Sequence, residues 1–173
     1  MDYVQSSYNY KGFQVTMTWM PEREFRDYEP ITQVYGIVFN DKGEILIARE
    51  SSSGKWQLPG GKPEKGESIE ETVRRELLEE VDVKAGIIYP LGVQKTEMPG
   101  NPNQDEGDLF YQVRCVVELG ELLPQTPDPD RGNVWERMFV SAEEVTEYIK
   151  WGTVGDAMFA DAIKLWKEKH QTS

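Results

Sequence analysis

Hydrophobic and polar residues alternate strictly from Phe13 to Trp19, which predicts a half-buried β-strand that ends at Pro21. Residues 31–39 and 44–48 predict a hairpin around the turn sequence Asn40-Asp41-Lys42-Gly43. Long turn-rich loops separate the apolar runs that follow. These runs predict further strands over residues 86–95, 109–119 and 135–140.

A helical pattern replaces the alternation in the middle of the chain. Ile69, Val73, Leu77 and Val81 form one apolar stripe at 3.6 residues per turn. Ser68 followed by Glu71 has the form of a capping box, which predicts that the helix begins there. The same pattern at Ser141 predicts a helix to about residue 150, and a last amphipathic helix is predicted over residues 154–169. Many strands and a few helices indicate an α+β or α/β sandwich.

Size and composition fit one soluble domain. The chain has 173 residues, with 38% hydrophobic and 29% charged residues and no apolar run near the ~20 residues of a membrane span. The amino terminus shows no secretory signal, and the single cysteine, Cys115, lies in an apolar run as a small core residue. One cysteine allows no intrachain disulfide, so a cytoplasmic location is expected.

The charge balance excludes several classes of partner. A formal net charge of −12 argues against nonspecific binding to nucleic acid or to an anionic membrane. The only histidine, His170, lies three residues from the carboxyl terminus, which removes a Ser-His-Asp or Cys-His nucleophile and a zinc site of Cys and His. The remaining chemistry is that of carboxylates and a metal ion. A bound metal ion would also offset the negative charge of a phosphorylated substrate and so let it bind.

One acidic arc of the central helix carries candidate metal ligands. Glu76, Glu79 and Glu80 fall on an arc roughly 100° wide by helical geometry. Pro59-Gly60-Gly61 and Lys65-Gly66 precede the helix, and such glycines allow close backbone approach. A solvated acidic face is the simpler interpretation of a charge run. The glycine turn favours a site for a hard divalent cation such as Mg²⁺.

The stretch from Gly61 to Val83 resembles the Nudix box. Gly61 is followed after five residues by Glu67, after seven more by Arg75-Glu76-Leu77, and one residue later by Glu79-Glu80. The preceding run Trp56 to Gly61 also resembles the usual approach to that box. One position departs from the family, because Asp82 stands where the family has glycine. We expect Asp82 to close the helix in the left-handed region, at a small cost in stability and with no loss of metal ligands.

The resemblance implies the Nudix fold, a mixed sheet between helices, and hydrolysis of a nucleoside diphosphate linked to another group X. A water activated by Mg²⁺ or Mn²⁺ would attack one phosphorus of the pyrophosphate. Glu76, Glu79 and Glu80 match the metal-binding carboxylates, the Gly60 carbonyl a further ligand, and Glu67 an accessory carboxylate. Arg75 matches the residue that orients Glu76 and its neighbours through a bidentate pair.

The general base and the substrate stay open at this point. The resemblance allows a base in the box or in a later loop, where the candidates are Asp128, Asp130, Glu106 and Glu136. Pro99 faintly resembles the proline that marks relatives cleaving ADP-ribose, and ordinary or oxidised nucleoside triphosphates are the alternative substrates. The aromatic residues available to stack a base are Trp19, Tyr35, Phe110 and Trp135.

An alternative hypothesis about function and a prediction of domain organisation complete the sequence analysis. A Nudix-fold module that binds a nucleotide or regulates without cleaving it is the alternative to catalysis, although all box carboxylates are present. Residues 1–30 are expected to be an N-terminal β-strand extension, followed by a Nudix hydrolase domain over residues 31–173. The extension is an edge strand, a wall of the substrate pocket, or the contact of a homodimer.

Overall fold

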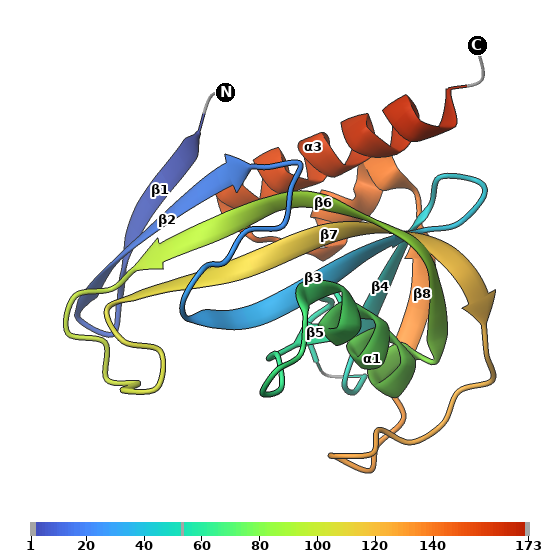
Figure 1. The fold of residues 1–173 in the computed structure, drawn as a ribbon, viewed down its shortest axis with the longest axis horizontal. Helices are drawn as coiled ribbons and strands as arrows, with labels where there is room; N and C mark the ends of the chain where they lie inside the picture. The colour runs from blue at the N-terminus through green and yellow to red at the C-terminus, as the bar shows by residue number, and fades with distance from the viewer. Residues whose placement is uncertain (1–2, 53, 172–173) are drawn as a thin grey trace.

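One mixed eight-stranded sheet runs through the molecule and separates two layers of helices (Figure 1). The computed structural model describes residues 3–52 and 54–171. The strands are β1 (Val4–Tyr10), β2 (Phe13–Pro21), β3 (Ile31–Phe39), β4 (Ile45–Arg49), β5 (Gly60–Gly61), β6 (Val83–Glu97), β7 (Leu109–Leu122) and β8 (Glu136–Val140). The helices are α1 (Ile69–Val81), the 3₁₀ helix η1 (Ala142–Glu144), α2 (Val145–Tyr148) and α3 (Gly152–His170).

The sheet has the strand order β1-β2-β6-β7-β3-β4-β8, with the short strand β5 added beside β3. Strand β3 is parallel to β7, and the other neighbours are antiparallel. Gly60 pairs with Tyr35 and Gly61 with Val34, so the glycine turn is fixed at the middle of β3.

Helix α1 covers one face of the sheet, and α2 and α3 cover the other (Figure 1). The apolar stripe of α1 packs Val73, Leu77 and Val81 into a core with residues such as Val117 of β7. On the opposite face, Met158, Ala162 and other residues of α3 pack into a second core with β3 and β4. Burial of one face of each helix against a common sheet confirms the predicted α+β sandwich.

Helix α1 begins and ends as its residues predict. The Ser68 side chain accepts from the amide of Glu71, and the Glu71 carboxylate accepts from the amide of Ser68, at 3.1 Å and 2.7 Å. Asp82 ends the helix in the left-handed region with φ 53° and ψ 44°. The capping box and the left-handed end together fix which side chains face the cleft described below.

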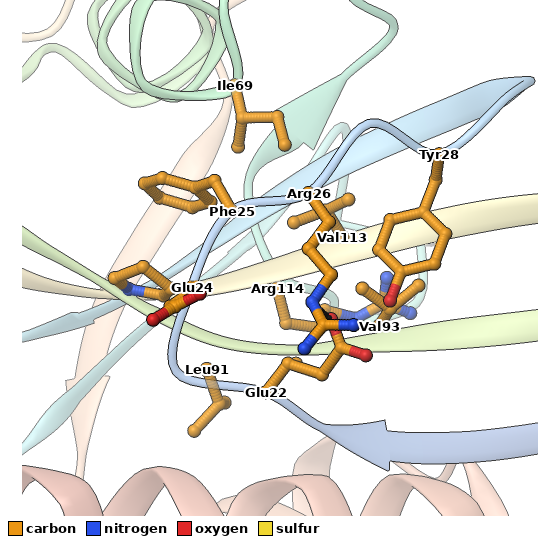
Figure 2. Close-up of a pocket in the computed structure, with 12 residues that line it drawn as sticks. Glu22, Glu24, Phe25, Arg26, Tyr28, Ile69, Leu91, Val93, Val113 and Arg114 are labelled. Atoms are coloured by element: carbon orange, nitrogen blue, oxygen red, sulfur yellow. Dashed lines mark ion pairs between the residues drawn. The ribbon is translucent and has the colours of Figure 1, made fainter.

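Residues 3–29 extend the sheet beyond β6. The strand β2 pairs with β6, and β1 pairs with β2 as an edge strand that the sequence pattern did not predict. Residues 22–29 then cross the α1 face, where Phe25 lies toward Ile69 and Arg26 pairs with Glu22 (Figure 2). The Tyr28 ring packs 4.8 Å from that of Tyr111. The extension therefore shares the sheet and both cores with the rest of the chain.

The helix predicted over residues 141–150 is wrong in extent. The structure has a 3₁₀ turn followed by the four-residue helix α2, and Ser141 makes no side-chain cap hydrogen bond. Its hydroxyl donates instead to the carboxylate of Glu143, at 2.7 Å. Val145 and Ile149 are buried, so packing holds this short segment. In the described residues, no helix has both the length and the apolar character needed to cross a bilayer.

Candidate active site

A cleft of about 600 Å³ opens where α1, β5, the end of β4 and the loop formed by residues 123–135 meet. We call it the acidic cleft, because seven carboxylates and three cationic side chains line it. The carboxylates are Glu50, Glu64, Glu76, Glu79, Glu80, Asp128 and Asp130, and the cations are Lys62, Arg75 and Arg131. This excess of negative charge favours a cation as the first occupant of the cleft.

The glycines of β5 allow α1 to approach the sheet edge closely. A Cβ atom at Gly60 would lie 2.2 Å from the carbonyl oxygen of Val34, inside the backbone of β3. A Cβ atom at Gly61 would lie 2.2 Å from Oε1 of Glu76. Only glycine fits at both positions, and its absence of a side chain leaves the room in which the Glu76 carboxylate lies.

Arg75 holds the carboxylates of the cleft in an ion-pair network. Its Nε and Nη2 donate to the two oxygens of Glu67 at 2.7 and 2.9 Å, which is a bidentate pair. Its Nη1 donates to Glu76 at 2.7 Å and to Glu79 at 3.3 Å. Arg75 was predicted to orient Glu76 and its neighbours through a bidentate pair. In the structure it contacts Glu76 and Glu79 through Nη1 alone, and the bidentate partner is Glu67. The planar guanidinium can pair with both oxygens of one carboxylate side by side, as it does with Glu67, whereas Glu76 presents only Oε1 to it.

Glu67 is therefore engaged on both oxygens. It also accepts from the Thr72 hydroxyl at 2.7 Å and from the amide of Glu64 at 3.1 Å. The Arg75 guanidinium is the main cause of a pKa that falls to about 2 for Glu67. With its oxygens already bonded, Glu67 acts in this arrangement as the anchor of Arg75.

Glu80 carries the largest electrostatic penalty in the cleft. Burial, followed by the nearby carboxylates of Glu76 and Asp128, raises the pKa of Glu80 to about 8, although the amide of Gly60 donates to it at 3.0 Å. Burial likewise raises the pKa of Glu76, against the effect of Arg75. Buried carboxylates that repel one another are stabilised by a cation between them.

The donor set fits a divalent metal by its chemistry, because Glu76, Glu79 and Glu80 offer hard oxygen ligands beside the backbone of Gly60. Within residues 3–52 and 54–171, however, no group of three or more Asp, Glu, His or Cys side chains is arranged to hold a metal ion. Arg75 occupies Glu76 and Glu79, and the Gly60 amide occupies Glu80. These bonds engage Oε1 of Glu76, Oε2 of Glu79 and Oε2 of Glu80, so each carboxylate keeps its second oxygen for a metal ion.

The 123–135 loop brings two of the four base candidates to the cleft. Asp128 is buried, and its oxygens accept from the amides of Asp130 and Arg131 and from Nε1 of Trp135, at 2.8–3.1 Å. Asp128 thus shapes the loop, whereas Asp130 is exposed at the cleft. Arg137 ties this loop to the end of α1, since it donates to the carbonyls of Val81 and Leu123, each at 2.6 Å.

The other base candidates lie elsewhere. Glu106 is in the loop between β6 and β7, where it accepts from the Asn101 side chain at 3.3 Å, and it does not line the acidic cleft. Glu136 begins β8 and pairs with Arg49 at 2.6 Å. Both carboxylates are engaged outside the cleft, so the structure corrects their placement.

The four aromatic residues predicted to stack on a base lie in different parts of the structure. Trp19 is 1% exposed in the core and donates from Nε1 to Asp161 at 2.7 Å, so it lies outside the cavities and its placement is corrected. Trp135 lines the acidic cleft but is buried beneath it. Phe110 lines a second cavity of about 700 Å³, and Tyr35 lines both this cavity and the cleft.

Several cleft residues were not predicted. Glu50 follows directly after β4 and pairs with Arg131 at 3.0 Å, and its place at the end of a strand was the available signal. Gln57 lines both cavities. Arg114, in the second cavity, gave no signal in the sequence because a single charged residue within an apolar run has no characteristic spacing.

Comparison with known proteins adds family information to this geometry. The model of the NUDIX domain matches residues 30–162. The chain is 38% identical over 76 residues to a putative 8-oxo-dGTP diphosphatase of Bacillus subtilis (strain 168), which covers 43% of this chain and 48% of that protein. It is 27% identical over 156 residues to an ADP-ribose pyrophosphatase of Methanocaldococcus jannaschii, covering 83% and 89% of the two chains.

The chain spans about half or less of the length of the first curated relatives that it matches. Among solved structures, the Bacillus subtilis pyrophosphohydrolase BsRppH superposes with a TM-score of 0.63 and 17% identity over 97% of this chain and 99% of the other. At this identity the likeness concerns the fold.

Proposed function

Because this chain belongs to the Nudix family, we propose that it is a metal-dependent hydrolase that cleaves the pyrophosphate bond of a nucleoside diphosphate linked to another group X. The observation that carries the proposal is the gathering of Glu76, Glu79 and Glu80 in one cleft, with Glu80 bonded to the amide of Gly60 and Glu76 lying against Gly61. Relatives named as diphosphatase and pyrophosphatase agree with this class of reaction.

Glu76, Glu79 and Glu80 would hold the metal, and the best-suited ions are Mg²⁺ and Mn²⁺, which take carboxylate oxygens and keep positions for phosphate and water. When bound, the ion supplies neutralisation of phosphate charge and acidification of a coordinated water. The carboxylates set where the ion lies, and Arg75, released from Glu76 and Glu79, gains donors for a phosphate oxygen. Asp130, exposed at the cleft, is the loop carboxylate best placed to accept a proton.

The substrate has its phosphates in the acidic cleft and its nucleoside in the second cavity. Tyr35 and Gln57 line both spaces, so one extended molecule reaches from one to the other. ADP-ribose-like molecules and nucleoside triphosphates both have this form, in keeping with the relatives' names.

The test is a panel of nucleoside diphosphate derivatives and triphosphates with Mg²⁺ or Mn²⁺, with release of phosphate and nucleoside monophosphate as the readout. Glu79→Gln and Glu80→Gln should each lower turnover at least ~10²-fold, as expected for loss of several kcal/mol of electrostatic stabilisation. Glu70→Gln, on the same helix but paired with Arg74 at the surface, is the matched control and should retain activity. Binding of nucleotides without any hydrolysis would favour the non-catalytic module instead.

A further inference from the structure

Arg114 is a buried cation at the inner end of the second cavity. It lies on β7 with 2% of its surface exposed, on the sheet face that α3 covers. The cavity it lines also contains Tyr8 of β1, Phe110 of β7 and Trp151 before α3. Tyr35 lines both this cavity and the acidic cleft, and the Arg114 guanidinium lies 4.4 Å from the centre of its ring.

The guanidinium of Arg114 has donors without acceptors. Its Nη2 donates to Oε1 of Gln112 at 3.2 Å and, at the 3.5 Å limit, to Oε1 of Gln94. Its Nε and Nη1 are shielded from solvent and have no hydrogen-bond partner. No carboxylate of the described chain forms an ion pair with it. Burial lowers the pKa of Arg114 to about 10.

A purely structural role explains this arrangement poorly. The Tyr35 ring and the Trp151 ring, 5.5 Å from the guanidinium, attract the cation through their π faces. Such contacts use the face of the guanidinium, whereas its five N–H donors lie in its plane. A buried cation without in-plane acceptors costs stability, and an apolar side chain of the same size would avoid that cost.

The surroundings of Arg114 decide what kind of acceptor fits. The Nη2 donor faces the side-chain oxygens of Gln94 and Gln112, so this guanidinium already pairs with neutral carbonyl oxygens. The aromatic residues Tyr8, Phe110 and Trp151 in the cavity offer apolar surface for a flat ring. A neutral heterocycle with a carbonyl oxygen at its edge satisfies both conditions.

We propose, building on the proposed function, that Arg114 recognises the carbonyl edge of a 6-oxopurine base and makes the enzyme prefer guanine-type over adenine nucleotides. A guanidinium pairs with O6 and N7 of guanine, which are both acceptors. Adenine presents an amino group in place of O6, so a donor would face a donor. The base would fill the second cavity while its phosphates lie in the acidic cleft beyond Tyr35.

The test is calorimetric binding of non-hydrolysable GTP, ITP and ATP analogues in the presence of Mg²⁺. The wild-type protein should bind the GTP and ITP analogues at least about tenfold more tightly than the ATP analogue, as one paired base edge allows. Arg114→Met should weaken binding of GTP and ITP analogues by about that factor and leave ATP binding nearly unchanged. Lys84→Met, which removes an exposed cation of β6 that pairs with Glu121 outside this cavity, is the control and should preserve the preference.

Thermal unfolding separates this role from a structural one. Arg114→Met should keep or raise the unfolding temperature of the ligand-free protein, because it removes an uncompensated buried charge. Equal loss of affinity for GTP and ATP analogues, no loss, or a lower unfolding temperature with unchanged preference would each overturn the proposal. If the wild type hydrolyses nucleotides but Arg114→Met keeps the base preference, only this inference fails. If no nucleotide is hydrolysed, the proposed function fails.

Discussion

Asp82 and Thr126 join the end of helix α1 to the loop that borders the acidic cleft. The Asp82 carboxylate accepts from the amide of Thr126 at 2.8 Å and from its hydroxyl at 2.5 Å. The carbonyl of Asp82 accepts from the amide of Leu123 at 2.9 Å. A glycine at this position would close the helix but would provide no such side-chain contact. Asp82 therefore positions the 123–135 loop, which carries Asp128 and Asp130.

This relationship changes what is expected of Asp82→Gly. The substitution relieves roughly 1–2 kcal/mol of strain at positive φ but loses two hydrogen bonds to a carboxylate, each worth about 1.5 kcal/mol. The unfolding free energy should therefore fall by about 1–2 kcal/mol, which urea denaturation measures. Turnover should fall too, because the loop loses one of its tethers to α1. Thr126→Val removes the hydroxyl contact without changing residue 82 and should lower both quantities less. A gain in stability for Asp82→Gly would show that the contact contributes little.

Removing Arg75 should destabilise the metal-free protein. In Arg75→Met, Glu67, Glu76 and Glu79 lose their common cation, and the half-buried carboxylates repel one another. We expect a loss of about 2 kcal/mol in EDTA, of which Mg²⁺ restores a part by taking the place of the guanidinium. Denaturation with EDTA and with millimolar Mg²⁺ measures both effects.

The control for this change is Arg74→Met on the same helix. Arg74 pairs with Glu70 and donates to the carbonyls of Ala85 and Gly86, and both side chains of the ion pair are more than 40% exposed, so its loss should cost at most about 1 kcal/mol. Equal losses of unfolding free energy in the two variants would mean that the Arg75 network stabilises the protein no more than the Arg74 pair does. Absence of any Mg²⁺ effect in Arg75→Met would argue against a metal between these carboxylates.

Gly61→Ala should impair the site more than the fold. The added methyl would lie 2.2 Å from Oε1 of Glu76, so the carboxylate must move from its place. We expect kcat to fall and the apparent affinity for Mg²⁺ to weaken at least tenfold. The unfolding temperature should change little. Gly36→Ala is the control, because its added methyl meets Leu77 and Val117 only at 3.4 Å. Normal Mg²⁺ affinity in Gly61→Ala would mean that the position of Glu76 does not set metal binding.

Trp19→Phe tests the corrected placement of a predicted stacking residue. Trp19 is fully enclosed and donates to Asp161, so the change leaves a gap and an unpaired carboxylate oxygen. The unfolding free energy should fall by about 1–3 kcal/mol, while KM for nucleotides stays the same. A raised KM at unchanged stability would instead indicate that Trp19 contacts the substrate.

Much of the fold followed from local patterns. The α1 boundaries were predictable because Ser68 and Glu71 act within one turn, and the end at Asp82 follows from a backbone preference. Patterns of apolar residues predicted the strands but not their full length, as β6 begins at Val83 and continues to Glu97. The sequence pattern did not predict strand β1, because its residues are largely exposed and its stability comes from pairing with β2.

The candidate site was predictable only where one helix carries it. Glu76, Glu79 and Glu80 share a helix face, so spacing alone places them together. The pairing of Arg75 with Glu67 depends on how the glycine loop folds back onto α1. The loop that carries Asp128 is held by the distant contact between Asp82 and Thr126. Arg114 lies beside Tyr35 because β7 pairs in parallel with β3. No local pattern distinguished Asp128 from Glu106, or Trp135 from Trp19.

The central claim is that the carboxylates of α1 bring a divalent cation to the substrate's phosphates, and coupled binding tests it most directly. A non-hydrolysable nucleotide should bind weakly in EDTA, because phosphate and acidic cleft repel each other, and tightly in millimolar Mg²⁺. The nucleotide should raise the affinity for Mg²⁺ by the same factor as Mg²⁺ raises that for the nucleotide. Calorimetric titration in both orders measures the two factors, which the account predicts to be large and equal. Equal nucleotide affinity in EDTA and in Mg²⁺ would contradict it.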